Sequence, residues 1–142
     1  MPTTLKKRTK LAKNYSPSED EKFMGVKQVE YFRQKLENWK HDLAAQIQNT
    51  MDFLKGESVS HPDVADMASA NADRQLELRT KDRLRKLISK IDQALTRIED
   101  GSYGYCVETG DPIRLGRLEA RPIATLTIEA QEMHEQGERR GQ

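Results

Sequence analysis

The chain has 142 residues, with 24 Lys and Arg against 23 Asp and Glu, so its charges nearly cancel. This balance excludes the strong positive field of a dedicated nucleic-acid binder, and we expect a protein partner and no sequence-specific DNA contact. The sequence also lacks the ~20 apolar residues of a membrane span and the apolar core of a signal peptide, so we expect a cytoplasmic protein with no membrane segment.

Residues 1–25 are predicted to form a basic tail and a short N-terminal helix. The first 13 residues contain no acid and five cations, which are Lys6, Lys7, Arg8, Lys10 and Lys13. This pattern is typical of a solvated tail, and the alternative is weak electrostatic help in binding a partner. Further on, Ser16, Pro17 and Glu19 have the spacing of a capping box and predict a helix as far as Met24.

Residues 26–100 are predicted to form a long antiparallel coiled-coil hairpin. Apolar residues recur at spacings of 3 and 4 in both halves, first at Val29, Phe32, Leu36, Trp39, Leu43, Ile47, Met51 and Leu54, then at Leu84, Leu87, Ile91, Ala94 and Ile98. This spacing forms a helical seam. Two helices, about 26–55 and 71–100, joined by a short connection return antiparallel. Residues 56–70, which include Gly56 and Pro62, are therefore predicted to be the tip of the hairpin.

Residues 101–142 are predicted to form a small globular domain and a C-terminal helix. Gly and Pro punctuate short runs of Tyr, Val, Ile and Leu, a pattern typical of turns and of a two-stranded ribbon. Thr127 is the predicted N-cap of the last helix. A domain this small is marginal alone, so we expect it to dock on the base of the hairpin and on the N-terminal helix. The fold class is therefore mainly α.

Five segments of the sequence resemble the DksA/TraR family of RNA polymerase secondary-channel factors. They are Asp63-Val64-Ala65-Asp66-Met67-Ala68, Glu77-Leu78-Arg79, Lys86-Leu87-Ile88, Tyr103-Gly104-Tyr105-Cys106 and Arg117-Leu118-Glu119-Ala120-Arg121-Pro122. They occur in the family's order and spacing over about residues 26–135. The resemblance implies a non-enzymatic bacterial regulator whose hairpin tip enters the polymerase secondary channel and alters open-complex stability.

The resemblance also implies two polymerase contacts. Asp63, Asp66 and Ala68 correspond to the tip near the polymerase catalytic centre, where Ala68 is important because it is small. From the residues alone, aspartates at a loop-to-helix boundary are more often simple helix caps, and the family resemblance reverses that preference for Asp66. Arg79 and Arg83 correspond to residues that meet the rim of the channel, although a solvated basic helix face is the alternative.

Family members form, together with polymerase, a site for the alarmone guanosine tetraphosphate (ppGpp), the effector of the stringent response. The resemblance assigns Leu87, Lys90 and Arg121 to this site. Gln131 stands where relatives carry a basic residue, so we expect weaker ppGpp binding, because phosphate groups favour cations.

The resemblance places a degenerate zinc finger after residue 100. The family's four cysteine ligands correspond here to Cys106, Thr109, Thr127 and Ala130, and Cys106 is the only cysteine in the chain. A structural zinc site needs four nitrogen or sulfur ligands, and His134 nearby would supply only a second one. We therefore expect no zinc and no other cofactor bound by the chain alone.

Two other functions fit the same pattern. Asp63 and Asp66 could hold Mg²⁺ in the polymerase and promote transcript cleavage, as the Gre factors do with acidic hairpin tips. The helical seams could instead join separate chains in a structural coiled-coil protein. The hairpin interpretation predicts a monomer, since each seam is satisfied within one chain.

Overall fold

The computed structural model describes residues 8–56 and 64–141. Four helices follow one another along the chain: α1 (Val26–Gly56), α2 (Val64–Asp100), α3 (Leu115–Ala120) and α4 (Ile128–Arg139). The chain divides into two compact units, the first comprising Met1–Leu36 with Asp92–Gln142 and the second Glu37–Ile91. Both α1 and α2 contribute to each unit. The predicted mainly α fold is confirmed.

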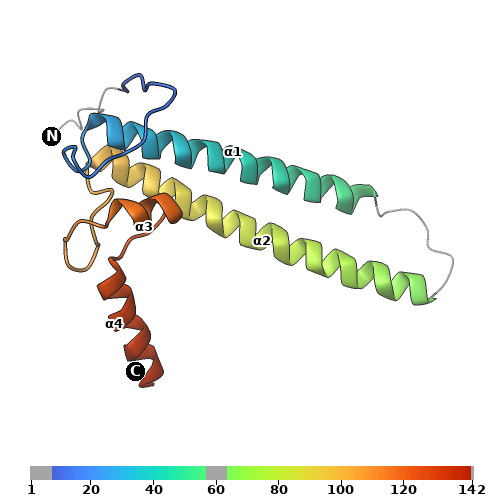
Figure 1. The fold of residues 1–142 in the computed structure, drawn as a ribbon. Coiled ribbons are helices and arrows are strands. Elements are labelled where there is room, and N and C mark those ends of the chain that lie inside the picture. Colours follow the sequence, from blue (N-terminus) through green and yellow to red (C-terminus); the bar gives the residue numbers. More distant parts are fainter. Residues whose placement is uncertain (1–7, 57–63, 142) are drawn as a thin grey trace. The chain divides into compact units, whose positions relative to one another are not determined.

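In the second unit, α1 and α2 lie side by side and antiparallel (Figure 1). The predicted seam residues Leu43, Leu84 and Ile91 are buried, whereas other residues of the seam are half-buried. Partial burial is expected because two helices cover only one stripe on each other. The hairpin prediction is therefore confirmed.

The second helix begins earlier than predicted. It starts at Val64, not at about Asn71, so residues 64–70 of the predicted tip belong to α2. Three alanines occur in this segment, at positions 65, 68 and 70, and a fourth follows at position 72. Alanine has the highest helix propensity, which explains why the helix extends toward the tip.

The core of the first unit joins both long helices to the residues after Asp100. Phe32 on α1 and Ile98 on α2 are almost fully buried, together with Tyr103, Ile113 and Leu118. The rings of Phe32 and Tyr103 lie 5.8 Å apart, and the Tyr103 hydroxyl donates to the Pro122 carbonyl at 2.7 Å. Burial raises the pKa of Tyr103. The predicted docking of the small domain on the base of the hairpin is confirmed, whereas the predicted docking on an N-terminal helix is wrong, because residues 16–24 form no helix.

The predicted helix from Ser16 to Met24 is wrong, because this segment forms turns. The Ser18 hydroxyl accepts from the backbone N–H of Asp20 at 3.1 Å, in a local turn. The buried side chain of Gln28 accepts from Met24 N–H and donates to the Ser18 carbonyl, both at 2.9 Å. These bonds satisfy backbone groups that a helix would otherwise use.

Part of the basic tail is also tied to the fold. The Glu30 side chain on α1 is only 2% exposed and pairs with both Arg8 and Arg33. Burial alone would raise the pKa of Glu30, but bonds from Arg8, Gln34 and Arg33 lower it. The expectation of a fully solvated tail is therefore wrong at Arg8.

Between α2 and α4, the chain is held mainly by backbone bonds. Ser102 and Tyr103 N–H both reach the Arg97 carbonyl, and Gly101, at φ 86°, closes α2 as a left-handed cap. The predicted ribbon is reduced, within the described residues, to a single antiparallel bridge between Tyr105 and Pro112. The predicted cap of the last helix is confirmed, since Thr127 Oγ1 accepts from Ala130 N–H at 3.2 Å.

Candidate functional site

The first turn of α2 carries the predicted tip residues of the second unit. Asp66 and Ala68 are both exposed there, while Asp63 lies outside the described residues. A carboxylate in the first turn is stabilised by the positive end of the helix dipole. The start of α2 therefore presents a negative charge and, two residues on, a surface with only a methyl group.

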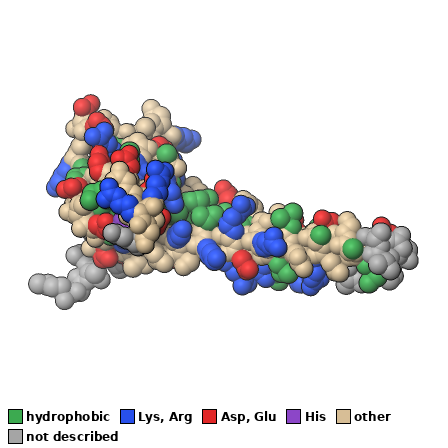
Figure 2. Space-filling view, turned by 90° about the horizontal axis from the view of Figure 1, so that it is seen from below, with side chains coloured by type: hydrophobic (Ala, Val, Ile, Leu, Met, Phe, Trp, Pro, Cys, Tyr) green, Lys and Arg blue, Asp and Glu red, His purple; other side chains and the backbone are tan. Residues whose placement is uncertain are grey.

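Farther along α2, Arg79 and Arg83 are both exposed. Their spacing of four residues places them on the same face of the helix. Figure 2 shows Lys and Arg side chains on this unit among exposed hydrophobic ones. The two arginines can thus meet an acidic protein surface together.

The sequence reasoning missed the exposed apolar side chains of the second unit. Phe53 is 45% exposed, Met67 50%, Leu76 60% and Leu78 40%. Leu76 and Leu78 do not fit the spacing of the buried seam. This mismatch in the sequence could have predicted that both side chains are exposed. Exposed apolar residues near exposed charges are typical of protein-binding surfaces.

The three residues that the resemblance assigns to ppGpp fall in both units. Leu87 is half-buried and Lys90 exposed on α2 in the second unit. Arg121 is exposed in the first unit, where it is the C-cap of α3 and its N–H bonds to the Arg117 carbonyl at 2.7 Å. Their joint role stays a prediction.

The four positions of the degenerate zinc finger come together in the first unit. The Cys106 sulfur accepts hydrogen bonds from the Thr109 hydroxyl and from backbone N–H groups, including that of Thr127. Thr127 Oγ1 in turn accepts from the N–H of Ala130. Burial of the thiol would raise its pKa, but these hydrogen bonds lower the pKa of Cys106 to about 7.

This donor set does not fit zinc. One thiol, two hydroxyls and a methyl group replace four strong ligands, and both hydroxyls already have hydrogen-bond partners. Among the residues that the structure describes, no group of three or more His, Cys, Asp and Glu is arranged to hold a metal ion.

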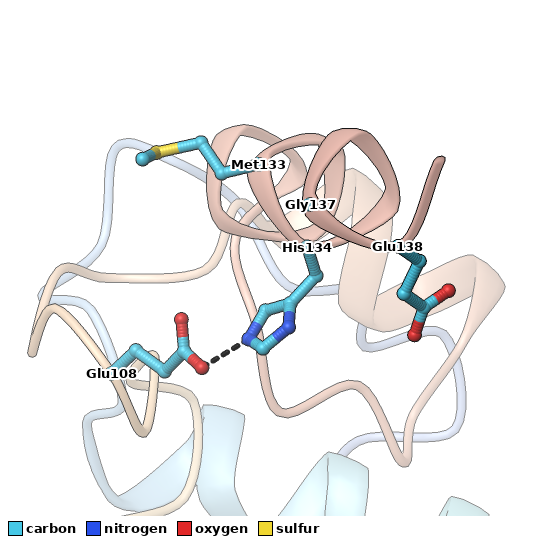
Figure 3. Close-up of a pocket in the computed structure, with 5 residues that line it drawn as sticks. All are labelled: Glu108, Met133, His134, Gly137 and Glu138. Atoms are coloured by element: carbon cyan, nitrogen blue, oxygen red, sulfur yellow. Dashed lines mark hydrogen bonds and ion pairs between the residues drawn. The ribbon is translucent and has the colours of Figure 1, made fainter. Parts of the chain in front are cut away.

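His134, the other candidate ligand, is engaged by a carboxylate. Its imidazole bonds to Glu108 across an open hollow of about 430 Å³, which Met133, Gly137 and Glu138 also line (Figure 3). The Glu108 carboxylate raises the pKa of His134. This pair links α4 to the turn that contains Cys106.

A cluster of three polar side chains holds α3 against α1. The Glu119 carboxylate accepts from the Tyr31 hydroxyl at 2.5 Å and from Lys35 Nζ at 2.6 Å. Both partners belong to α1. We call Tyr31, Lys35 and Glu119 the α3 clamp, because it ties the short helix that precedes Arg121 to a long one.

Comparison with known proteins matches both parts of the chain. Residues 28–98 match the N-terminal domain of the DnaK suppressor protein DksA, and residues 101–136 match the prokaryotic dksA/traR C4-type zinc finger. Among the helices of the described residues, none is both long and apolar enough to cross a bilayer.

Curated relatives match over most of their length. The RNA polymerase-binding transcription factor DksA of Caulobacter vibrioides is 61% identical over 126 residues, which cover 89% of each chain. The protein of the same name from Escherichia coli K12 is 38% identical, over 85% of this chain and 80% of its own.

A solved structure agrees with these matches. The transcription factor DksA2 of Pseudomonas aeruginosa superposes with a TM-score of 0.77 and 45% identity, covering 82% of this chain and 90% of that one. The sequence matches therefore extend to the arrangement of the backbone. The chain belongs to the DksA/TraR family of RNA polymerase-binding transcription factors.

Proposed function

We propose that the chain enters the secondary channel of RNA polymerase with the start of α2 leading, and that it alters the stability of the open promoter complex. The observation that carries this proposal is the start of α2, where Asp66 and Ala68 are both exposed within two residues of each other. A negative charge near the end of a helix, with a small residue two positions on, can approach a crowded catalytic centre and perturb it with little steric conflict.

Binding and regulation rest on different residues in this proposal. Arg79 and Arg83, exposed on one face of α2, contact the protein rim of the channel. Asp66 and Ala68 act beyond that rim. The chain acts as a monomer, reads no DNA sequence and supplies no catalytic group of its own.

The effector of the chain in this proposed function is ppGpp, and its small domain folds without zinc. Leu87, Lys90 and Arg121 contact the alarmone in the polymerase complex, and the cations pair with its phosphates. Support for a zinc-free domain comes from the donors around Cys106, which are one hydroxyl, that of Thr109, and backbone N–H groups.

The test compares two aspartates on α2. Asp66→Asn should still bind core polymerase but lose most of the effect on open-complex lifetime, because the charge at the tip is gone. Asp73→Asn, an equally exposed change on the same helix, is the matched control and should regulate normally. Lifetimes are measured on a promoter with an unstable open complex.

Two results would reject the tip assignment. One is normal regulation by Asp66→Asn. The other is cleavage of the transcript in stalled complexes that depends on Asp66, which would favour the Gre-like alternative. Ala68→Phe gives an independent readout, since a bulky side chain near the start of α2 should block close approach and lower regulation too.

A further inference from the structure

Three arginines surround a hollow beside α3 in the first unit. The hollow measures about 450 Å³, and Arg114, Arg117 and Arg121 line it. Glu19 is the single acidic residue among its lining residues, and Ile128 forms part of an apolar wall. The arginines are spaced by 3 and 4 residues along α3 and its flanks, so they lie on one side of the chain. The hollow therefore carries a net positive charge.

The arginines retain donors for a ligand. Arg114 and Arg121 are exposed, and their side chains make no hydrogen bond or ion pair with another residue in the described part of the chain. Arg117 donates one bond, from Nε to the Leu126 carbonyl at 2.9 Å, which uses one of its five N–H donors and fixes its guanidinium group.

This arrangement indicates the chemical class of the ligand. A planar guanidinium group binds two oxygens of a phosphate at once, and such charge-assisted bonds are stronger than neutral ones. One arginine is enough for a carboxylate or a single phosphate. Three around one hollow suit adjacent phosphate groups, whose charges need several cations.

We propose that this hollow binds a diphosphate group, and that Arg114 supplies a cation in addition to Arg121. The inference rests on the proposed function, in which ppGpp is the effector, and extends it to residues outside the predicted set. Gln131 cannot serve as a cation, and its amide already donates to Glu135 at 3.3 Å. Arg114 would thus add a cation in a domain where Gln131 supplies none.

The main experiment titrates ppGpp onto the complex of the full chain with core polymerase at fixed ionic strength, with open-complex lifetime as the readout. Arg114→Gln should raise the ppGpp midpoint by about 10-fold, the effect of losing one charge-assisted contact. Arg114→Lys keeps the charge but not the planar guanidinium group that binds two oxygens, so it should give a smaller rise in the ppGpp midpoint. Arg139→Gln, an exposed arginine on α4 outside the hollow, is the matched control and should leave the midpoint unchanged.

A second experiment tests the hollow without polymerase or alarmone. Inorganic pyrophosphate is titrated into the isolated full chain by calorimetry, with wild type, Arg114→Gln and Arg139→Gln compared. Wild type and Arg139→Gln should bind pyrophosphate equally, and Arg114→Gln should bind about 10-fold more weakly. Unchanged melting curves show that the exposed substitutions leave the fold intact.

The outcomes separate this inference from the proposed function. If Arg121→Ala raises the ppGpp midpoint and Arg114→Gln does not, the inference is wrong and the alarmone proposal stands. If the wild-type complex does not respond to ppGpp, the alarmone proposal fails and the pyrophosphate titration alone decides the inference. Equal pyrophosphate binding by wild type and Arg114→Gln then overturns it.

Discussion

The Cys106 sulfur is surrounded by hydrogen-bond donors. Its side chain is buried, and the hydroxyl of Thr109 and the N–H groups of Glu108, Thr109 and Thr127 all point to it. Donors stabilise the charged form of an acid, so they outweigh burial and lower the pKa of the thiol to about 7. At this single residue, hydrogen bonds stabilise the thiolate charge that a bound metal ion stabilises in a four-cysteine finger.

Thr109→Val should therefore move the pKa of Cys106 back toward its ordinary value of 9.0, because one donor is lost. Thiolate absorbance against pH measures this directly, since the chain has one cysteine. Thr96→Val, whose hydroxyl bonds a helix carbonyl, is the control. An unchanged titration in Thr109→Val would contradict the proposed role of the hydroxyl.

The same pKa predicts how stability depends on pH. Because the pKa of Cys106 is lower in the folded chain than in the unfolded chain, its thiolate stabilises the folded state fully above pH 9. This contribution is lost as the pH falls through about 7. Relative to Cys106→Ser, wild type should thus gain on the order of 2 kcal/mol in unfolding free energy as the pH rises through this range.

At the scale of elements, the α3 clamp determines how firmly a six-residue helix is held. Burial tends to raise the pKa of Glu119, but bonds from Lys35 and Tyr31 lower it. Burial, followed by the Glu119 carboxylate, raises the pKa of Tyr31 to about 12. Besides burial, both shifts have a common cause in the contact between Glu119 and Tyr31.

Glu119→Gln should loosen α3 and cost about 0.5 to 1 kcal/mol, a modest effect because the pair is partly exposed. Hydrogen exchange should speed up at the N–H groups of Leu118 and Arg121, whose acceptors lie in or beside α3. Glu132→Gln on α4 removes an exposed carboxylate outside the clamp and is the control. Equal exchange rates in the two variants would argue against the clamp.

At the scale of the whole molecule, the fold should be stable without metal. Structural zinc contributes an apparent ~10 to 16 kcal/mol in small fingers. Here the buried side chains of the first unit, including Tyr103, Ile113 and Leu118, replace it at roughly 1.5 to 3 kcal/mol each. The long helices share this core, so we expect that the small domain does not fold alone.

Chelator should consequently leave the melting temperature unchanged, and protein purified without added metal should contain little zinc. The control restores the ligands with Thr109→Cys, Thr127→Cys and Ala130→Cys together, which should create zinc binding and a melting temperature that falls with chelator. Stoichiometric zinc in the wild-type chain would show that the donor set has been misjudged.

The candidate site could be predicted from the sequence only where a short motif carries it. Asp66, Ala68, Arg79, Arg83 and Arg121 are exposed, which their predicted roles require, but the roles themselves stay predictions. Arg114 lies outside the recognised motifs, and its importance depends on which hollow it faces. No local pattern encodes that relation, because the hollow forms between segments far apart in the chain.

The sequence by itself determined the two long helices and the cap at Thr127, because a repeat of 3 and 4 residues and an N-cap hydroxyl act over neighbouring turns. Only the tertiary structure decided the turns before α1, where bonds from the buried Gln28 side chain outweigh the local capping signal. It also decided the pairing of Arg8 with Glu30, 22 residues away. The local repeat of apolar residues determines where helices form. Which polar groups become buried and must be paired depends on contacts between distant segments, and these exist only in the folded chain.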